Sequence, residues 1–274
     1  DRHAPDELCD NPDNSYSDSK ELIEKWHNKG RLRYAVTPRF APTSSSSQLN
    51  QAARLLNEYP SDDQTKGVLL QTHLNENDEE IAWVNDLFPD SNSYFGVYED
   101  HGITGNRSVF GHCIHNTEEE YQRMAKTGSK VSLCPTSNLF LGSGLFELEK
   151  LESYGIDVSL ASDVGGGDSF SMFKVMNEAY KICRLNDFNL DPIKAFYLTT
   201  LGAAKVLDMN DSIGNFEVNK EADFIVIDLN ATEIISQKNK IAMGVNDILF
   251  NLMTLGDDRL IDEVFILGQR AYKK

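Results

Sequence analysis

A histidine and a glutamate stand three residues apart at the end of an apolar stretch, in His73-Leu-Asn-Glu76. Residues 67–72 are mostly apolar, which is typical of a strand buried on both faces of a parallel sheet. Asn75 and Asn77 favour a turn and a helix cap, and a helical pattern follows at once. A turn directly after His73 would bring its imidazole and the Glu76 carboxylate to one rim. A metal-binding imidazole beside a carboxylate is what hydrolysis by a metal-activated water requires.

Both residues also have an ordinary structural explanation. A histidine at a strand end is usually a hydrogen-bonded polar residue, and a glutamate at the start of a helix favours the helix dipole. The recurrence of the pattern favours the functional interpretation. The sequence predicts five strands, each followed by a helix, at residues 31–37, 67–72, 107–111, 130–134 and 157–161. The carboxyl ends of these strands carry the polar residues Arg39, His73, His112, Asn138 and Asp163.

The alternation of strands and helices predicts an α/β fold with a parallel sheet. In a (β/α) barrel the active site lies at the carboxyl ends of the strands, so one pocket would collect all five polar residues. An open flavodoxin-like sheet is the alternative, because it also places ligands at strand ends. Strands at 222–228 and 261–267 depart from this alternation and predict a small flanking sheet. We therefore expect a partial barrel at residues 1–210 and a C-terminal tail at 211–274.

The composition excludes some classes of partner. The 274 residues carry a formal net charge of -17 with a pI near 4.7, which argues against nucleic acid or an anionic membrane as partner. A small neutral ligand is not affected by this field.

The four cysteines form no CxxC pair, so free thiols in a reducing compartment are expected. The triple glycine at 165–167 lacks the features of a P-loop, and no apolar run approaches transmembrane length.

Five longer motifs are more specific: Thr37-Pro-Arg-Phe-Ala-Pro42, His73-Leu-Asn-Glu-Asn77, Cys134-Pro-Thr-Ser-Asn-Leu-Phe-Leu-Gly-Ser-Gly144, Ser162-Asp-Val-Gly-Gly-Gly167 and Leu255-Gly-Asp-Asp258. With these motifs the chain resembles the amidohydrolase superfamily and, within it, the guanine deaminase family. The similarity covers nearly the whole chain. The HxxE and Ser-Asp motifs alone indicate only a deaminase of cyclic amidines, whereas the set as a whole is similar to enzymes that act on guanine.

The resemblance implies an amidohydrolase-type (β/α)8 barrel, of which this chain supplies strands four to eight, with one zinc ion per active site. His73 at the end of the fifth strand and Asp163 at the end of the eighth match metal ligands. His112, at the end of the sixth strand, matches the histidine that orients the attacking water. Glu76 matches the group that carries protons. The resemblance thus implies Glu76, His112 and Asp163 as the catalytic residues.

The same resemblance implies the substrate and its contacts. Arg39 and Phe40 match positions that hold the purine, and His73, Glu76 and Asp163 are expected beside it. The implied reaction is the hydrolytic deamination of guanine to xanthine and ammonia, by a cytoplasmic homodimer. Two alternatives stay open: another zinc-dependent purine or azine deaminase of the superfamily, and a truncated subunit that binds without catalysis.

The front of the family's barrel has no match in this sequence. The HxH pair of the first strand, which supplies two further zinc ligands, is not found, and the sequence starts without a methionine. It therefore resembles the C-terminal part of a longer protein. With His73 and Asp163 as two of four ligands, we expect residues 1–274 alone to bind zinc weakly and to lack guanine hydrolysis. Asn75 and Asn219 also depart from the family pattern, which has a serine and a glycine there.

Overall fold

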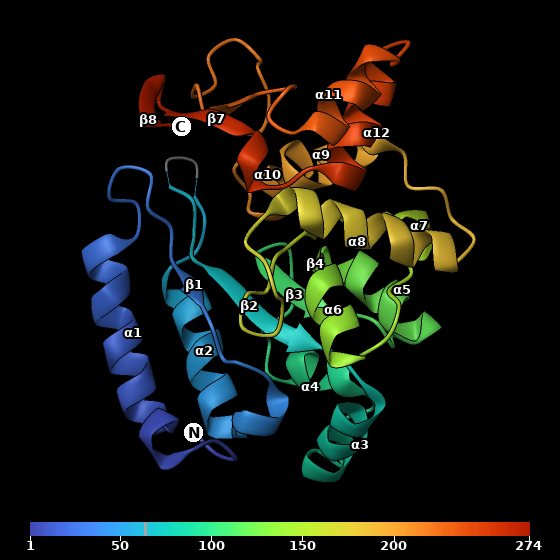
Figure 1. The fold of residues 1–274 in the computed structure, drawn as a ribbon. Coiled ribbons are helices and arrows are strands. Elements are labelled where there is room, and N and C mark those ends of the chain that lie inside the picture. The colour runs from blue at the N-terminus through green and yellow to red at the C-terminus, as the bar shows by residue number, and fades with distance from the viewer. Residues whose placement is uncertain (63–64) are drawn as a thin grey trace. The chain divides into compact units, whose positions relative to one another are not determined.

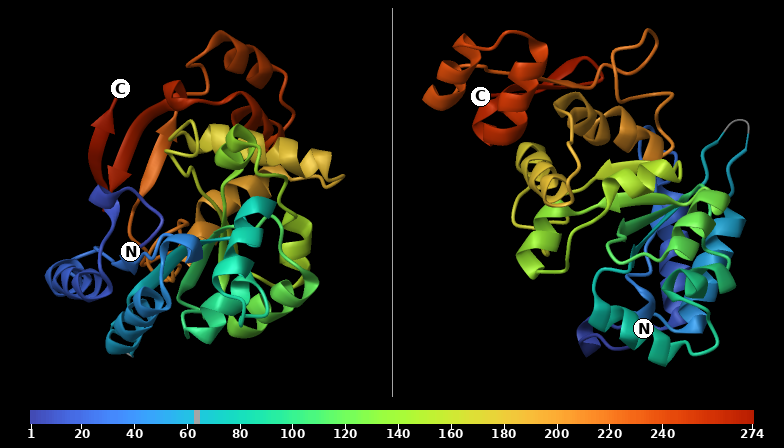
Figure 2. Two further views of the ribbon diagram at one scale, coloured as in Figure 1. Left: turned by 90° about the horizontal axis from the view of Figure 1, so that it is seen from below. Right: turned by 90° about the vertical axis from the view of Figure 1, so that its right-hand side faces the viewer.

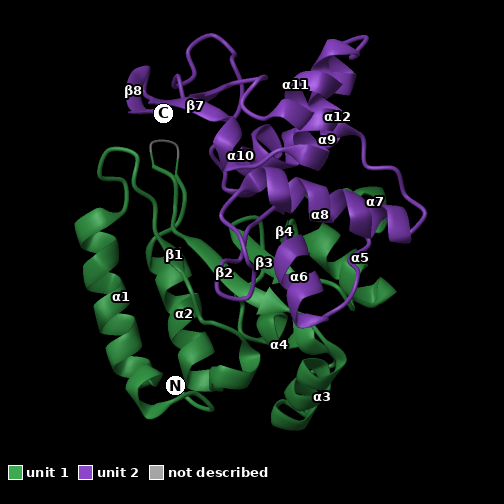
Figure 3. Cartoon of the chain, in the orientation of Figure 1, with its two compact units in different colours: residues 1–132, 150–157 green, residues 133–149, 158–274 purple. Residues whose placement is uncertain are grey.

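The computed structural model describes residues 1–62 and 65–274 and contains two compact units (Figures 1 and 3). The first unit consists of residues 1–132 and 150–157, and the second of residues 133–149 and 158–274. The expected division at residue 210 into barrel and tail stays a prediction. Within the described residues, no helix is both long and apolar enough to cross a membrane.

Parallel strands form the centre of the first unit, in the order β1-β2-β3-β4. The pairing of β2 with β3 runs from Leu70 opposite Ser108 to Leu74 opposite His112. Every residue of β3 is buried, because parallel strands are covered on both faces. The strands are β1 (Ala35–Val36), β2 (Leu69–Leu74), β3 (Ser108–His112) and β4 (Lys130–Leu133), whose last residue belongs to the second unit.

Polar side chains cap the helices of the first unit. The Asn77 side chain accepts a hydrogen bond from the Glu80 N–H. The spacing of Thr117 and Glu120 predicts a capping box, and the structure confirms it. Where α1 packs against α2 (Figure 2), the Tyr16 hydroxyl donates to the Glu58 carboxylate. The helices are α1 (Pro12–Trp26), α2 (Ser46–Glu58), α3 (Asp78–Leu87), α4 (Tyr94–Asp100), α5 (Glu118–Thr127) and most of α7 (Leu148–Ser153), with 3-10 turns η1 (Asp6–Leu8) and η2 (Ala41–Thr43).

The second unit contains the fifth parallel strand and a small antiparallel sheet. The Ala161 N–H donates to the Leu133 carbonyl, which places β5 (Val158–Leu160) beside the end of β4. The antiparallel sheet has the order β6-β7-β8, and Phe224 stacks on Phe265 across it at 4.5 Å between ring centroids. Its elements are β6 (Phe224–Ile227), β7 (Ile261–Ile266) and β8 (Gln269–Lys273), and the helices are α6 (Pro135–Leu141), α8 (Met172–Leu185), α9 (Pro192–Thr199), α10 (Leu201–Val206), α11 (Glu233–Lys240), α12 (Val245–Leu255) and η3 (Asp258–Leu260).

The structure corrects some element boundaries in the N-terminal part. The sequence predicts loop up to residue 17 and a capping box at Asp18 and Glu21, but α1 begins at Pro12. Asn11 caps this helix by accepting from the Asn14 N–H, and proline suits the first helical position because it lacks an N–H. The predicted strand at 31–37 is reduced to two residues, whereas β2 continues to Leu74.

The C-terminal part also differs in detail from the prediction. The expected helix at 191–207 is divided into α9 and α10, because Thr200 has φ -127° and ψ -99°. The two predicted tail strands are confirmed as β6 and β7, and β8 joins them. The sequence of β8 is polar and all of its residues are exposed, so it lacks the apolar signal of a buried strand.

Candidate active site

The neighbouring ends of β2 and β3 bring three predicted site residues together in the first unit. The register pairs His73 with Gly111 and Leu74 with His112. The imidazole rings of His73 and His112 lie 5.1 Å apart between centroids, with their planes inclined by 32°. His112 is buried, and its Nε2 lies 3.7 Å from Glu76 Oε2. Both imidazoles and the carboxylate therefore belong to one local cluster.

Unusual backbone conformations end both strands. The expected turn directly after His73 lies one residue later in the structure. Strand β2 continues to Leu74, and the chain turns at Asn75, which has φ 51°. After β3, His112 and Cys113 have φ values of 69° and 51°. Residues other than glycine seldom adopt this left-handed conformation, so the surrounding bonds must hold it. One such bond, from the Cys113 N–H to the Leu74 carbonyl at 2.9 Å, joins the two turns.

The main-chain carbonyl of Arg39 determines which nitrogen of His73 carries the proton. This oxygen accepts from the His73 N–H at 3.2 Å and lies 2.7 Å from His73 Nδ1. A carbonyl oxygen can only accept, so Nδ1 is the protonated nitrogen and Nε2 carries the lone pair. A carbonyl partner of this kind is a common way to orient a metal-binding histidine. His73 therefore has the tautomer that a metal ligand needs.

The side chains of Arg39 and Phe40 lie against each other and form the Arg39–Phe40 surface beside His73. The Arg39 guanidinium carbon lies 4.6 Å from the centre of the Phe40 ring, and that centre lies 5.8 Å from the centre of the His73 ring. Trp83 of α3 approaches Phe40 edge to face at 6.4 Å. The two predicted purine-binding residues are thus adjacent to the predicted metal ligand.

Tyr98 of α4 is a buried residue that sequence reasoning did not find. Its hydroxyl donates to the His73 carbonyl at 2.8 Å, accepts from the Ala41 N–H at 3.0 Å and lies 3.2 Å from Thr72 Oγ1. Burial raises the pKa of Tyr98, so the phenol keeps its proton. No sequence signal distinguishes this tyrosine, because its hydrogen-bond partners Ala41 and His73 are distant from it in the chain. It supports the backbone on both sides of the candidate site.

Glu80 of α3 is a second residue that the sequence did not indicate. It is buried, whereas Glu79 beside it is exposed. Burial raises the pKa of the Glu80 carboxyl, and the negative charge of Glu76 adds to the rise. A carboxyl group in an acidic first helical turn normally faces solvent. Sequence alone therefore gave no reason to single it out.

The sixth predicted site residue, Asp163, belongs to the second unit. It follows β5 with φ 47°, and its carbonyl accepts from the Gly167 N–H at 2.5 Å. The triple glycine has a steric role here: a Cβ at Gly167 would lie 2.1 Å from the Ser162 carbonyl oxygen. Residues 164–167 therefore form a tight turn, with an isolated bridge between Val164 and Gly167. Asn138, also in the second unit, lies buried in α6.

The comparisons with known proteins agree with the fold. The family model described as "Amidohydrolase family" matches residues 3–271. Guanine deaminase from Escherichia coli (strain K12) is 47% identical over 274 residues, which is 100% of this chain and 61% of the relative. A solved E. coli guanine deaminase superposes with a TM-score of 0.97, at 47% identity, over 100% of this chain and 63% of that one.

Two further structures extend the comparison. Guanine deaminase from C. acetobutylicum, solved with guanine in its active site, has a TM-score of 0.88 and 30% identity and covers 99% of this chain and 63% of that one. An adenosine deaminase from Xanthomonas campestris with bound zinc has a TM-score of 0.80 and 21% identity, over 93% of this chain and 55% of its own, and shows the fold alone.

The chain thus spans about three fifths of the length of the relatives that it matches. The predicted α/β fold of amidohydrolase type, with parallel strands and a small antiparallel sheet, is confirmed, and the flavodoxin-like alternative is not favoured. Since the family model matches nearly the whole sequence, this chain belongs to the amidohydrolase family.

Proposed function

We propose that the complete protein containing this chain hydrolyses guanine to xanthine and ammonia. The observation that carries the proposal is the cluster of His73, Glu76 and His112 beside the Arg39–Phe40 surface. The 47% identity to a guanine deaminase, and the guanine in the active site of the C. acetobutylicum enzyme, support guanine over other ring systems. In this proposal His73, Glu76 and Asp163 contact the substrate as well.

The side chains of Arg39 and Phe40 suit recognition of a planar purine. An aromatic ring offers a flat apolar face, on which a heterocycle can stack. The guanidinium presents several N–H donors in one plane, and guanine carries a carbonyl oxygen and ring nitrogens that can accept them. The pair lies next to His73, so a purine held there would have its reacting carbon near the catalytic cluster.

The chemical nature of the donors fits zinc, which binds imidazole nitrogen and carboxylate oxygen. His73 would contribute Nε2, the nitrogen that the Arg39 carbonyl leaves with its lone pair, and Asp163 a carboxylate oxygen. One zinc ion per site would lower the pKa of a water molecule to near neutrality.

Glu76 and His112 would then move and stabilise charge. The Glu76 carboxylate would accept a proton from the attacking water and deliver it to a ring nitrogen next to C2, and would then carry the proton of the new C2 hydroxyl to the departing amine. His112, with Nε2 3.7 Å from Glu76, keeps the carboxylate and the water in orientation. The C2–N bond breaks as the new C2–O bond becomes a carbonyl, so guanine and water give xanthine and ammonia.

The test is ammonia release from a panel of substrates by the purified, zinc-loaded complete protein. The rate of ammonia release from guanine should far exceed the rates from adenine, cytosine and S-adenosylhomocysteine. Preference for one of the others would favour the alternative deaminase of the same superfamily. Binding of guanine without ammonia release would favour the non-catalytic subunit.

We also propose that the complete protein is a cytoplasmic homodimer. The resemblance of the sequence to guanine deaminases implies both properties. Light scattering on the purified protein measures the oligomeric state directly, and a monomeric mass would contradict the dimer.

A further inference from the structure

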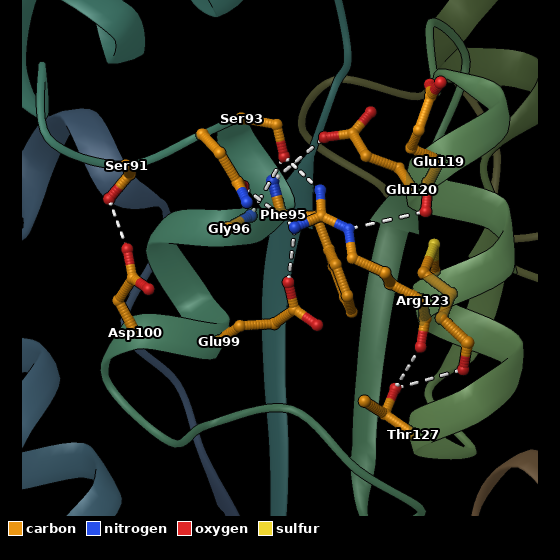
Figure 4. A network of polar contacts seen from close by, with 12 residues as sticks. Ser91, Ser93, Phe95, Gly96, Glu99, Asp100, Glu119, Glu120, Arg123 and Thr127 are labelled. Atoms are coloured by element: carbon orange, nitrogen blue, oxygen red, sulfur yellow. Dashed lines mark hydrogen bonds and ion pairs between the residues drawn. The ribbon is translucent and has the colours of Figure 1, made fainter.

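Glu120 of α5 is a buried carboxylate whose bonds extend beyond its own helix. It is 2% exposed. Its Oε2 accepts from the Thr117 N–H at 3.0 Å and from Asn75 Nδ2 at 2.9 Å, and its Oε1 accepts from the Phe95 N–H at 3.1 Å. Figure 4 shows the carboxylate reaching across from α5 to the start of α4. The capping box explains only the bond to Thr117, since such a box forms equally well at an exposed helix end.

Asn75, on the other side of this contact, is the residue at which the chain turns between His73 and Glu76. It is 1% exposed and has φ 51°. Its Nδ2 donates to Glu120 and also to Asn116 Oδ1 at 2.8 Å.

The backbone of Asn75 connects this turn to the one that follows His112. The Asn75 carbonyl accepts from the N–H groups of Ile114 and His115, both at 3.1 Å. Asn75 therefore ties the turn that carries Glu76 to the turn that carries His112.

From this geometry we propose that Glu120, acting through Asn75, is a positioning residue that sets the distance between Glu76 and His112; the proposal rests on the proposed deaminase function. Burying a carboxylate costs free energy unless hydrogen bonds replace its water. Here the donors include the side chain of the turn residue itself. A displacement of about 1 Å in a reacting group can reduce the rate about 100-fold.

The chemistry of the contact allows a direct test by exchange of donor and acceptor. Glu120→Gln places an amide N–H₂ against the Asn75 amide, and Asn75→Asp places two carboxylates together. The double variant Asn75→Asp/Glu120→Gln reverses the direction of the bond and has the same net charge as the wild type. Asn75→Gly is a further variant, since glycine adopts the left-handed conformation without strain but lacks the side chain.

The kinetic experiment measures kcat and KM for guanine in the complete, zinc-loaded protein at a temperature where all variants are folded by circular dichroism. We expect Glu120→Gln, Asn75→Asp and Asn75→Gly each to lower kcat about 10- to 100-fold, with a smaller change in KM. The double variant should recover part of the loss, because it restores a bond between positions 75 and 120 but not the bonds to Asn116 and Thr117. Glu119→Gln, on the same turn of α5 but exposed, should leave both parameters unchanged.

Three results would overturn the inference: single variants with wild-type kcat, a double variant no better than the worse single variant, or losses that appear only when the protein unfolds. If the wild type releases no ammonia from guanine, the proposed function fails, and crystal structures of the wild type and the variants then decide the inference. A changed distance between His112 Nε2 and Glu76 Oε2 in the single variants supports it. An unchanged distance in all variants refutes it.

Discussion

Glu76 and Glu80 stand four residues apart, yet their surroundings suit opposite tasks. Glu76 lies at the rim, with His112 3.7 Å away, where a carboxylate can exchange protons with a substrate. Glu80 is buried behind it, and burial raises its pKa. A raised pKa reduces the negative charge that Glu80 places beside Glu76, compared with an exposed glutamate at the same pH. In the proposed mechanism Glu76 reacts, whereas Glu80 supports the segment that carries it.

Glu76→Gln in the complete protein should lose most guanine turnover, while zinc content and guanine binding persist. The amide is nearly isosteric but cannot accept and release a proton, and such groups contribute about 10²–10⁴-fold to the rate. Ammonia release, zinc analysis and calorimetric binding measure the three properties. Glu79→Gln at the exposed neighbouring position is the control. A Glu76→Gln variant with the wild-type rate would show that another group carries the proton.

Glu80→Gln should change how stability depends on pH. The folded protein binds the Glu80 proton more tightly than the unfolded chain, because burial raises its pKa above the ordinary 4.5. Its contribution is therefore complete below that ordinary value and is lost as the pH rises through the raised one. The variant should lose less stability than the wild type across this range. Chemical unfolding at a series of pH values measures this, and parallel curves for the two proteins would contradict it.

At the scale of elements, the candidate site depends on sharp turns at strand ends. The turns at Asn75, at His112–Cys113 and at Asp163 all use left-handed backbone conformations. Such a turn changes the direction of the chain at a single residue, so the side chains that follow can point to a new side. In a continuing strand, side chains only alternate between the two faces of the sheet. The cost of each conformation is met by hydrogen bonds, as between Cys113 and Leu74.

Gly167→Ala should disturb the turn that carries Asp163. The added Cβ would lie 2.1 Å from the Ser162 carbonyl oxygen and 2.8 Å from Thr136 Oγ1, so the backbone must shift. Overpacking of this kind costs about 1–3 kcal/mol. We expect a lower melting temperature and reduced zinc content. Gly244→Ala is the matched control, because a Cβ there meets no atom within 4 Å; equal behaviour of the two variants would show that the turn tolerates a side chain.

The sequence predicted most of the strands, their polar ends and the capping box of α5, because these signals are local. It did not predict β8, whose residues are exposed. It missed the position of the turn after His73 by one residue, since strand ends depend on pairing with a neighbour. Tyr98 and Glu80 carried no signal, because their burial comes from contacts with distant segments. Tyr98 reaches back across 57 residues to Ala41, which no local pattern encodes.

At the scale of the whole molecule, the net charge of -17 produces a strongly negative field. We expect this field to disfavour nucleic acids and anionic surfaces as partners, whereas it exerts no long-range force on a neutral purine. The ionic strength of the solution should therefore influence recognition very little.

For the complete protein, kcat/KM with guanine should stay nearly constant between low and physiological ionic strength. Salt screens interactions between charges over about 8–10 Å, and a neutral substrate offers no charge to screen. Initial rates in a sodium chloride series measure the effect. A steep decline with salt would indicate that charge steering contributes to capture of the substrate.

The main-chain carbonyl and the side chain of Arg39 make separate contacts, and it is the carbonyl that bonds to His73. The main-chain oxygen sets the imidazole tautomer, whereas the guanidinium faces the aromatic ring beside it. Any amino acid at this position supplies the same carbonyl. If Arg39 binds the purine and His73 the metal, as proposed, a different side chain at position 39 would change the choice of heterocycle and leave the tautomer of His73 unchanged. Substrate range could then change without a change in the catalytic chemistry.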